Sequence, residues 1–417
     1  MSDPAATDFQ KANPAPVDSS VGGGRWGVRF LGALPLVAIV LAGVAGHATS
    51  TLKPLIIQAF VHSIGFDKAT AGYLLTVEMI STSAGTIVAT AFPLALRRRE
   101  YLFVALALTM LANLASIPFK GDVGIVLYGL RCLSGLGAGF GLGRLGILIA
   151  LSARPGRTAG LYSVTTQLYG AAAAFAMPLI ERLCGTNSIF VILAGTIPLA
   201  LLMIAWIPEH HVRAVKEKAI SAAQSQPLGL VEKLVLATSF GVFYLGVGTF
   251  WPFISVLGET AGVGRAQITA VLGWGALVSA LGSITAIFAG DRKASAPIIT
   301  LVFIGLCLSV ALQLFFPRSF SFFVASALLF AYAYWVINPM ILGVMSKLDT
   351  SGQMNGVYYI VAVGGISLGP ALAGWILTHE GDRFTSAALL RVISVLLLAS
   401  SATVQAYYAF RARHLPD

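Results

Sequence analysis

The chain has 417 residues, of which 57% are hydrophobic and 11% are charged, and its mean hydropathy is +0.84. Soluble domains carry about 25% charged residues, so this composition excludes an ordinary soluble protein and a disordered chain. The net charge of +10 comes from basic residues placed between apolar runs, which indicates orientation in a membrane rather than nucleic-acid binding. We therefore expect a multi-pass membrane protein.

Residues 1–24 are polar and no apolar stretch of signal-peptide length follows them, so we interpret them as a disordered tail. Apolar runs of helix length then predict twelve membrane-spanning helices. The first six spans are expected at 30–60, 70–95, 101–118, 122–152, 159–180 and 188–207. The last six are expected at 233–257, 267–289, 296–316, 319–346, 355–378 and 386–409.

These spans divide the chain into two halves. We predict an N-terminal six-helix bundle at 25–207, a polar connecting loop at 208–232, a C-terminal six-helix bundle at 233–410 and a short tail at 411–417. Of the 27 Lys and Arg residues, 17 lie on the side of the termini and the connecting loop, and six lie on the opposite side. The positive-inside rule therefore places both termini in the cytoplasm, which requires an even number of spans.

An internal repeat links the two halves. Thr51-Leu52-Lys53-Pro54 recurs as Thr249-Phe250-Trp251-Pro252 at an offset of 198. Gly65 and Lys68 recur as Gly262 and Arg265 at an offset of 197, and Gly160-Leu161-Tyr162 recurs as Gly356-Val357-Tyr358 at an offset of 196. Near-constant offsets in three places indicate duplicated six-helix halves, an architecture that transporters use.

The segment 127–139 reads Leu-Tyr-Gly-Leu-Arg-Cys-Leu-Ser-Gly-Leu-Gly-Ala-Gly, an Arg followed by spaced glycines. With twelve spans and a 6+6 repeat, the chain resembles the major facilitator superfamily over about 25–410. The resemblance implies an all-α membrane fold of two pseudo-symmetric six-helix bundles and a transport activity without enzyme chemistry. It also implies that Arg131, at the position of the signature Arg, takes part in proton transfer or anion binding.

Other family signatures are only partly kept. The loop after the second predicted span has the expected basic cluster, Arg97 to Arg99, but lacks the family's Gly and Asp. The matching loop of the second half keeps Gly290-Asp291-Arg292-Lys293. The resemblance therefore implies gating roles for Arg97, Arg98, Asp291 and Arg292. The drug-exporter signature departs at 170–178 and finds a closer likeness at 365–370, which favours uptake over export.

Charged residues inside membrane spans are costly, so each is a functional candidate. Glu78 is the only acidic residue that we place well inside a span. Burial disfavours its charged form, as proton coupling requires, whereas a neighbouring Arg131 would stabilise that form. The alternatives are a structural Glu78 paired with an Arg or a helix hydroxyl, and an Arg131 that joins helices through backbone carbonyls.

Three further polar residues of the first four spans are candidates for substrate binding. Lys53 is positioned to hold a carboxylate or, alternatively, to snorkel to the interface. His47 lies six residues earlier, about 120° away around a regular helix, so the two share a face only if Pro54 distorts the turn. A lone membrane His more often satisfies a hydrogen bond than binds a ligand. Arg144 is a candidate for the inner gate or for snorkelling.

A second set of candidates is aromatic or neutral and comes from later spans. Aromatic rings with a few polar groups suit a flat or amphipathic organic substrate. Interface belts and ordinary helix packing are the alternative explanation of such residues. The members are Gln167, Tyr244, Trp251, Trp335, Asn338, Tyr358 and Tyr359.

From these features we expect a secondary transporter that takes up a small organic anion, an aromatic one being favoured, together with protons. The rivals are proton-coupled efflux of hydrophobic or cationic compounds and a non-transporting membrane sensor with the same fold. We expect a monomer in the cell inner membrane, with a small molecule, protons and the lipid bilayer as partners and no nucleic acid. No cofactor or metal site is expected, because no nucleotide fingerprint or ligand spacing is present.

Overall fold

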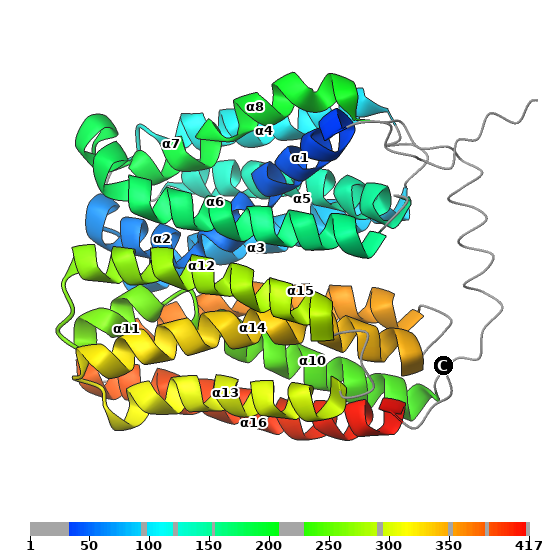
Figure 1. Cartoon of the computed structure of the whole chain (residues 1–417). Helices are drawn as coiled ribbons and strands as arrows, with labels where there is room; N and C mark the ends of the chain where they lie inside the picture. The colour runs from blue at the N-terminus through cyan, green and yellow to red at the C-terminus, as the bar shows by residue number, and fades with distance from the viewer. Residues whose placement is uncertain are drawn as a thin grey trace, which may run out of the picture.

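The computed structural model of the chain describes residues 33–92, 98–119, 124–151, 155–207, 229–289, 295–348, 353–379 and 383–413. Every regular element in these ranges is a helix (Figure 1), which confirms the predicted all-α fold. The predicted tail 1–24 lies outside the described residues, as does most of the connecting loop. The predicted boundaries of the two bundles stay a prediction.

We use "N-terminal half" for residues 33–207 and "C-terminal half" for 229–413. The N-terminal half contains α1 (Ala33–Thr51), α2 (Lys53–Gln58), η1 (Ala59–Ile64), α3 (Lys68–Ala91), α4 (Arg99–Ser116), α5 (Ile125–Leu151), α6 (Pro155–Cys184), α7 (Ser188–Gly195), α8 (Ile197–Met203) and η2 (Ile204–Trp206). The C-terminal half contains α10 (Leu230–Phe250), α11 (Ile254–Thr260), α12 (Arg265–Ala289), α13 (Ser295–Phe315), α14 (Phe320–Leu348), α15 (Gln353–His379) and α16 (Arg383–Arg413).

Helices lie over all twelve predicted spans, and ten helical segments of the described chain are long and apolar enough to cross a membrane. The other two spans correspond to α4 and α6. Both are long, but α4 begins with Arg99 and Glu100, and α6 carries several hydroxyl and amide side chains. These residues lower the hydropathy of the two helices without shortening them.

Two predicted spans are broken where the repeat places a proline. The first is interrupted at Leu52, between α1 and α2, and the seventh is interrupted after Phe250, between α10 and α11. Pro54 and Pro252 follow these points, and a proline lacks the N–H that would continue the helical ladder. The duplicated motif therefore produces a helix break at the same place in each half.

Glycines on α5 allow it to approach α3 very closely. A Cβ atom added to Gly135 would lie 2.2 Å from the carbonyl oxygen of Glu78, and one added to Gly139 would lie 2.0 Å from that of Thr82. Neither position has room for any side chain. This seam, defined by Gly135 and Gly139 against Glu78 and Thr82, brings the backbone of α3 beside Arg131 of α5.

The two halves meet through α3 with α15 and through α6 with α12. Described polar contacts between them gather at one end of the molecule, where α2, η1 and α11 lie (Figure 1). At this end Arg265 Nη2 lies 2.9 Å from Glu181 Oε1, and His62 Nε2 lies 2.5 Å from Glu259 Oε1. The others are Gln58–Thr269, Ala69–Thr378, Lys68–Leu377, Ser255–Pro54, Thr76–Ala371 and Arg265–Ser63. We call this the closed end.

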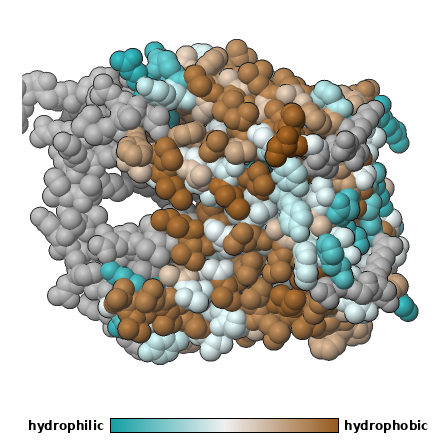
Figure 2. All heavy atoms as spheres, turned by 180° about the vertical axis from the view of Figure 1, so that it is seen from behind, coloured by the Kyte–Doolittle hydropathy of each residue, from teal (hydrophilic) through white to brown (hydrophobic). Residues whose placement is uncertain are grey.

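The outer surface of the helices is mostly apolar. Seen from behind, hydrophobic residues cover the middle of the molecule and hydrophilic residues gather toward its margins (Figure 2). Large exposed side chains on the outer helices include Val104, Leu111, Leu202, Leu301 and Phe288. Such a continuous apolar surface is what lipid contact requires.

The glycine seam predicts a sharp contrast between two substitutions in α5. Gly139→Ala forces a methyl group against the α3 backbone and is expected to lower stability by about 1–3 kcal/mol. Gly129→Ala is the matched control, because a Cβ atom there meets nothing within 4 Å. Alanine favours helix more than glycine does, so the control leaves the melting temperature unchanged or raises it. Thermal unfolding of both purified variants tests this, and equal melting temperatures would contradict the seam.

Candidate functional site

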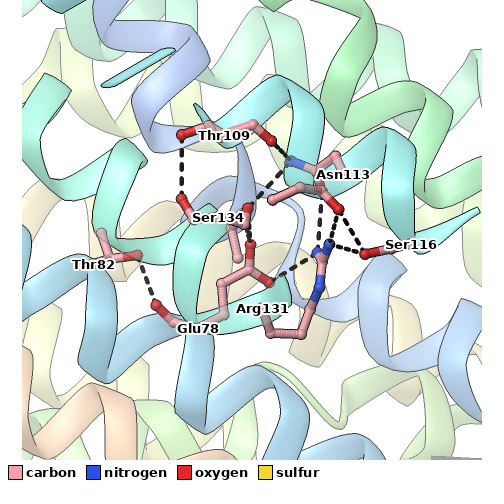
Figure 3. A network of polar contacts seen from close by, with 9 residues as sticks. Glu78, Thr82, Thr109, Asn113, Ser116, Arg131 and Ser134 are labelled. Carbon is pink, nitrogen blue, oxygen red and sulfur yellow. Dashed lines mark hydrogen bonds and ion pairs between the residues drawn. The ribbon is translucent and has the colours of Figure 1, made fainter. Parts of the chain in front are cut away.

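The carboxylate of Glu78 lies at the centre of a polar network in the N-terminal half (Figure 3). Glu78 is fully buried in α3, and no other acidic side chain in the described ranges is buried. Its Oε1 accepts hydrogen bonds from Ser134 Oγ at 2.8 Å and from Thr49 Oγ1 at 3.0 Å. Its Oε2 lies 3.4 Å from Arg131 Nη1. An ionised carboxylate only accepts hydrogen bonds, so all three contacts suit its charged form.

Arg131, also fully buried, spreads its guanidinium over α4. Nη1 donates to Asn113 Oδ1 at 3.0 Å, and Nη2 donates to Ser116 Oγ at 2.6 Å and to the carbonyl oxygen of Ala112 at 3.3 Å. Its Cζ lies 4.7 Å from the centre of the Phe190 ring of α7. Arg131 thus pairs with Glu78 and also joins α5 to α4 through a backbone carbonyl. Both structural contacts that the sequence analysis considered for these residues are present.

Second contacts lock this network in place. Asn113 Nδ2 donates to Ser134 Oγ at 3.2 Å, and Thr109 Oγ1 donates to the carbonyl oxygen of Ser134. The pair of charges is therefore surrounded by oriented dipoles instead of water. Removing one charge of such a buried pair leaves the other uncompensated, which typically costs about 3–5 kcal/mol.

The break in the first span lies between Thr49, which contacts this network, and the candidate Lys53. Thr49, the donor to Glu78, is on the last turn of α1, and Lys53 begins α2 after the interruption at Leu52. Lys53 is 6% exposed, and no described residue pairs with its ammonium. His47 packs edge-on against the ring of Tyr162, with the ring centres 6.1 Å apart. The interruption at Leu52 lies between His47 and Lys53, so the distortion near Pro54 that the sequence left open is present.

Gln167 and Arg144 have different surroundings. Gln167 is buried on α6, and its Nε2 has no hydrogen-bond partner within the described ranges. One turn later, Gly170 faces both Thr51 of α1 and Ala276 of α12. Arg144, which is buried on α5, donates through Nη1 to the carbonyl oxygen of Arg98. Arg144 therefore contacts the start of α4, and its roles at the inner gate or in snorkelling to the interface stay predictions.

Three candidates of the C-terminal half meet in one cluster. The hydroxyl of Tyr244 donates to Asn338 Oδ1 at 2.6 Å, and that of Tyr358 donates to the same oxygen at 2.8 Å. The two tyrosine hydroxyls also lie within hydrogen-bond distance of each other, and because each carries one proton only two of these three contacts can be hydrogen bonds at a time. Helices α10, α14 and α15 are thereby joined at a single amide oxygen. Asn338 therefore accepts hydrogen bonds that join three helices, and its role in substrate binding stays a prediction.

Aromatic rings continue from this cluster toward the break in the seventh span. Trp251 stacks on Phe330 with ring centres 5.3 Å apart and an interplanar angle of 6°. Phe330 is followed by Tyr334, whose ring in turn packs edge-on against Trp335 and Tyr244. Trp251 also borders α12 at Gly275, next to Ala276, which faces Gly170 and Thr51. Trp251 and Thr51, which lies two residues before Lys53, are thus both found near the contact of α6 with α12 at Gly170 and Ala276.

Most of the predicted gating residues lie outside the described residues. Arg97, Asp291 and Arg292 lie outside the described residues, and so does the side chain of Tyr359. Arg98 is exposed and takes part through its carbonyl oxygen, as the acceptor for Arg144. Their gating roles stay predictions.

Sequence reasoning missed the neutral partners of the two charges, namely Asn113, Ser116 and Ser134. Each also lies within reach of its own helix backbone, so neither residue type nor spacing separates these side chains from ordinary helix hydroxyls and amides. It also passed over Arg391, a fourth basic residue inside a span. For Arg391 the signal was present, because a charged side chain within a predicted span is rare.

No protein-family model and no curated protein sequence matches the chain. Solved structures do match over most of its length. An inward open structure of the xylose transporter XylE from E. coli has a TM-score of 0.64 at 12% identity, covering 88% of this chain and 94% of that one. The structure of tetrameric PepTSo2 has a TM-score of 0.66 at 10% identity, and the match covers 91% of this chain and 97% of that one. The structure of the human organic anion transporter MFSD10 has a TM-score of 0.58 at 14% identity, and the match covers 88% of this chain and 99% of that one.

Another matching structure names XylE as a proton:xylose symporter of the major facilitator superfamily. At 10–14% identity these likenesses concern the fold. The chain therefore has the major facilitator fold, as the signature at 127–139 implied.

The buried pair predicts non-additive stability. Arg131→Gln leaves the Glu78 carboxylate without its counter-charge and is expected to be strongly destabilising, whereas adding Glu78→Gln removes that charge and restores part of the loss. Thermal unfolding of the single and double variants measures this. As a control, Glu181→Gln at the half-exposed pair with Arg265 is expected to cost less than about 1 kcal/mol. A double variant no more stable than Arg131→Gln would rule out the pairing.

Proposed function

We propose that this chain is a secondary transporter that takes up a small organic anion together with protons, by alternating access. The proposal is carried by one observation. The buried Glu78–Arg131 pair is hydrogen-bonded through Thr49 to the helix that breaks just before Lys53. The fold supports it, since the structures that share this fold are named as transporters.

Glu78 is the proton site in this proposal. It is the buried carboxyl of the described chain, and its ionised form depends on Arg131, Ser134 and Thr49. Protonation removes the negative charge that Arg131 faces and leaves the guanidinium uncompensated. It also weakens the bond from Thr49, because hydrogen bonds to a charged acceptor are about twice as strong as neutral ones. Proton uptake therefore loosens the attachment of α1 to α3.

Lys53 is the proposed partner of the anionic group of the substrate. The Lys53 residue is 6% exposed and no described residue pairs with its ammonium, and the unpaired amide of Gln167 lies on the helix that packs on α1. The rings of Trp251 and Tyr334 would receive an aromatic or other flat part. A bound anion offsets the positive charge that protonation of Glu78 creates, so each is expected to strengthen the other.

The closed end supports alternating access. If the termini are cytoplasmic, as the basic residues predict, the closed end faces outward and the chain is in an inward-facing state. We place the protein in the cell inner membrane as a monomer. The rival proposal, efflux of cationic compounds, needs Glu78 to attract the cation. Arg131 already pairs with that carboxylate, which favours the anion.

The anion site predicts charge-selective stabilisation. Benzoate is expected to raise the melting temperature of the purified protein, more so at acidic than at alkaline pH, whereas the neutral benzamide is not. Lys53→Gln is expected to weaken benzoate binding by about tenfold or more, because a charge-assisted hydrogen bond is lost. Arg182→Gln, an exposed change at the end of α6, serves as the control and binds as the unmodified protein does. Equal stabilisation by benzamide would contradict the proposal that the substrate is an anion.

The proton site predicts a separation of two transport modes. Glu78→Gln is expected to abolish accumulation of the stabilising carboxylate driven by a pH gradient, while exchange of that carboxylate across proteoliposomes continues. A glutamine is close in shape to a protonated glutamate but releases no proton. Arg182→Gln, an exposed change at the end of α6 that leaves Glu78 in place, controls for nonspecific effects of substitution. If Glu78→Gln accumulates the carboxylate normally, Glu78 has no part in coupling.

A further inference from the structure

A cleft of about 560 Å³ lies at the closed end, on the outer side of the C-terminal half. It is formed by the turn between α13 and α14 and by the first turns of α16. Its lining combines two guanidinium groups, those of Arg318 and Arg391, with the aromatic rings of Phe316 and Phe384. None of these residues belongs to the Glu78 network or to the aromatic cluster around Tyr244.

Arg391 supplies a buried positive charge to this cleft. It is 2% exposed, and its Nη2 donates to Thr260 Oγ1 at 2.9 Å and to the carbonyl oxygen of Leu257 at 3.4 Å. Its Nε is buried without a hydrogen-bond partner, and no described carboxylate pairs with it. A buried charge without a counter-charge is strongly unfavourable in a membrane protein. Among the described residues Arg391 therefore has no counter-charge.

Arg318 brings a second positive charge to the mouth of the cleft. Its side chain is exposed, and its Cζ lies 5.0 Å from the centre of the Phe384 ring, which holds the guanidinium over the opening. Two guanidinium groups that line one cleft repel each other unless an anion lies between them. Arginine forks match the oxygen geometry of phosphate and carboxylate groups.

The surface around the cleft is apolar and exposed. Phe315, Phe316, Phe320 and Phe384 are each between 47% and 74% exposed beside it. The cleft also lies at the end of a membrane-spanning bundle, where aromatic rings meet lipid head groups. A small soluble anion would neutralise the arginines but would leave these rings uncovered. An amphiphile with a negative head group fits both features.

We propose that this cleft binds an anionic phospholipid, with its phosphate between Arg318 and Arg391 and its acyl chains along Phe315 and Phe320. Because Arg391 also donates to α11, the bound lipid braces the short helix that carries Glu259 of the closed end. The site is separate from the proposed transport site and does not depend on it.

The test compares lipids on the purified full-length protein by thermal unfolding and by native mass spectrometry. Phosphatidylglycerol is expected to stabilise the protein and to remain bound, and phosphatidylcholine is not. Arg318→Gln is expected to weaken retention of phosphatidylglycerol by about tenfold. Arg391→Lys keeps the positive charge but loses the planar fork, so it weakens retention as well. Arg182→Gln at the same end of the other half retains the lipid.

Three outcomes would overturn the proposal. One is equal retention of phosphatidylglycerol and phosphatidylcholine. Another is unchanged retention of phosphatidylglycerol by both Arg318→Gln and Arg391→Lys. The third is equal stabilisation by glycerol phosphate at the same concentration, which would assign the cleft to a soluble anion. None of these measurements involves Glu78 or Lys53, so their failure is distinct from failure of the proposed transport function.

Discussion

The pairing of Glu78 with Arg131 is the constraint on which the N-terminal half depends. Both side chains are fully buried, and neither charge is tolerable in an apolar interior without the other. Their meeting requires the backbones of α3 and α5 to touch, which the glycines at 135 and 139 allow. It also requires α4 to present an amide and a hydroxyl to the guanidinium. Helix composition, helix spacing and polar chemistry are therefore linked through one ion pair.

The two halves, although duplicated in sequence, carry different chemistry at comparable places. The break before Pro54 lies beside charged and hydroxyl side chains, whereas the break at Pro252 lies beside a stack of aromatic rings. In the N-terminal half the shared acceptor is a carboxylate, and in the C-terminal half it is the amide oxygen of Asn338. The N-terminal half thus carries a charged network, and the C-terminal half carries a neutral aromatic cluster. This division follows from side chains alone, because the backbone breaks are alike.

Much of the fold was predictable because membrane helices are specified locally by apolar length, and all twelve expected spans coincide with helices. Glu78 and Arg131 stood out for the same reason, since charge is rare in such segments. Their partners did not. Asn113 and Ser134 become partners only when α4 and α5 pack together, and that packing depends on contacts distant in the sequence. Arg391 shows the remaining limit, because the absence of a counter-charge among its described neighbours becomes visible only in the folded structure.

The closed end described above also sets an energy scale. The described contacts that join the halves there are mainly hydrogen bonds, and four of them link neutral groups. Bonds of this kind contribute about 0.5–1.5 kcal/mol each, so the set amounts to several kcal/mol. Reversing a two-state population from about 1:99 to 99:1 takes about 5.5 kcal/mol. If the proposed alternating access holds, the bound solute and the proton together would have to supply a free energy of this size to open the closed end.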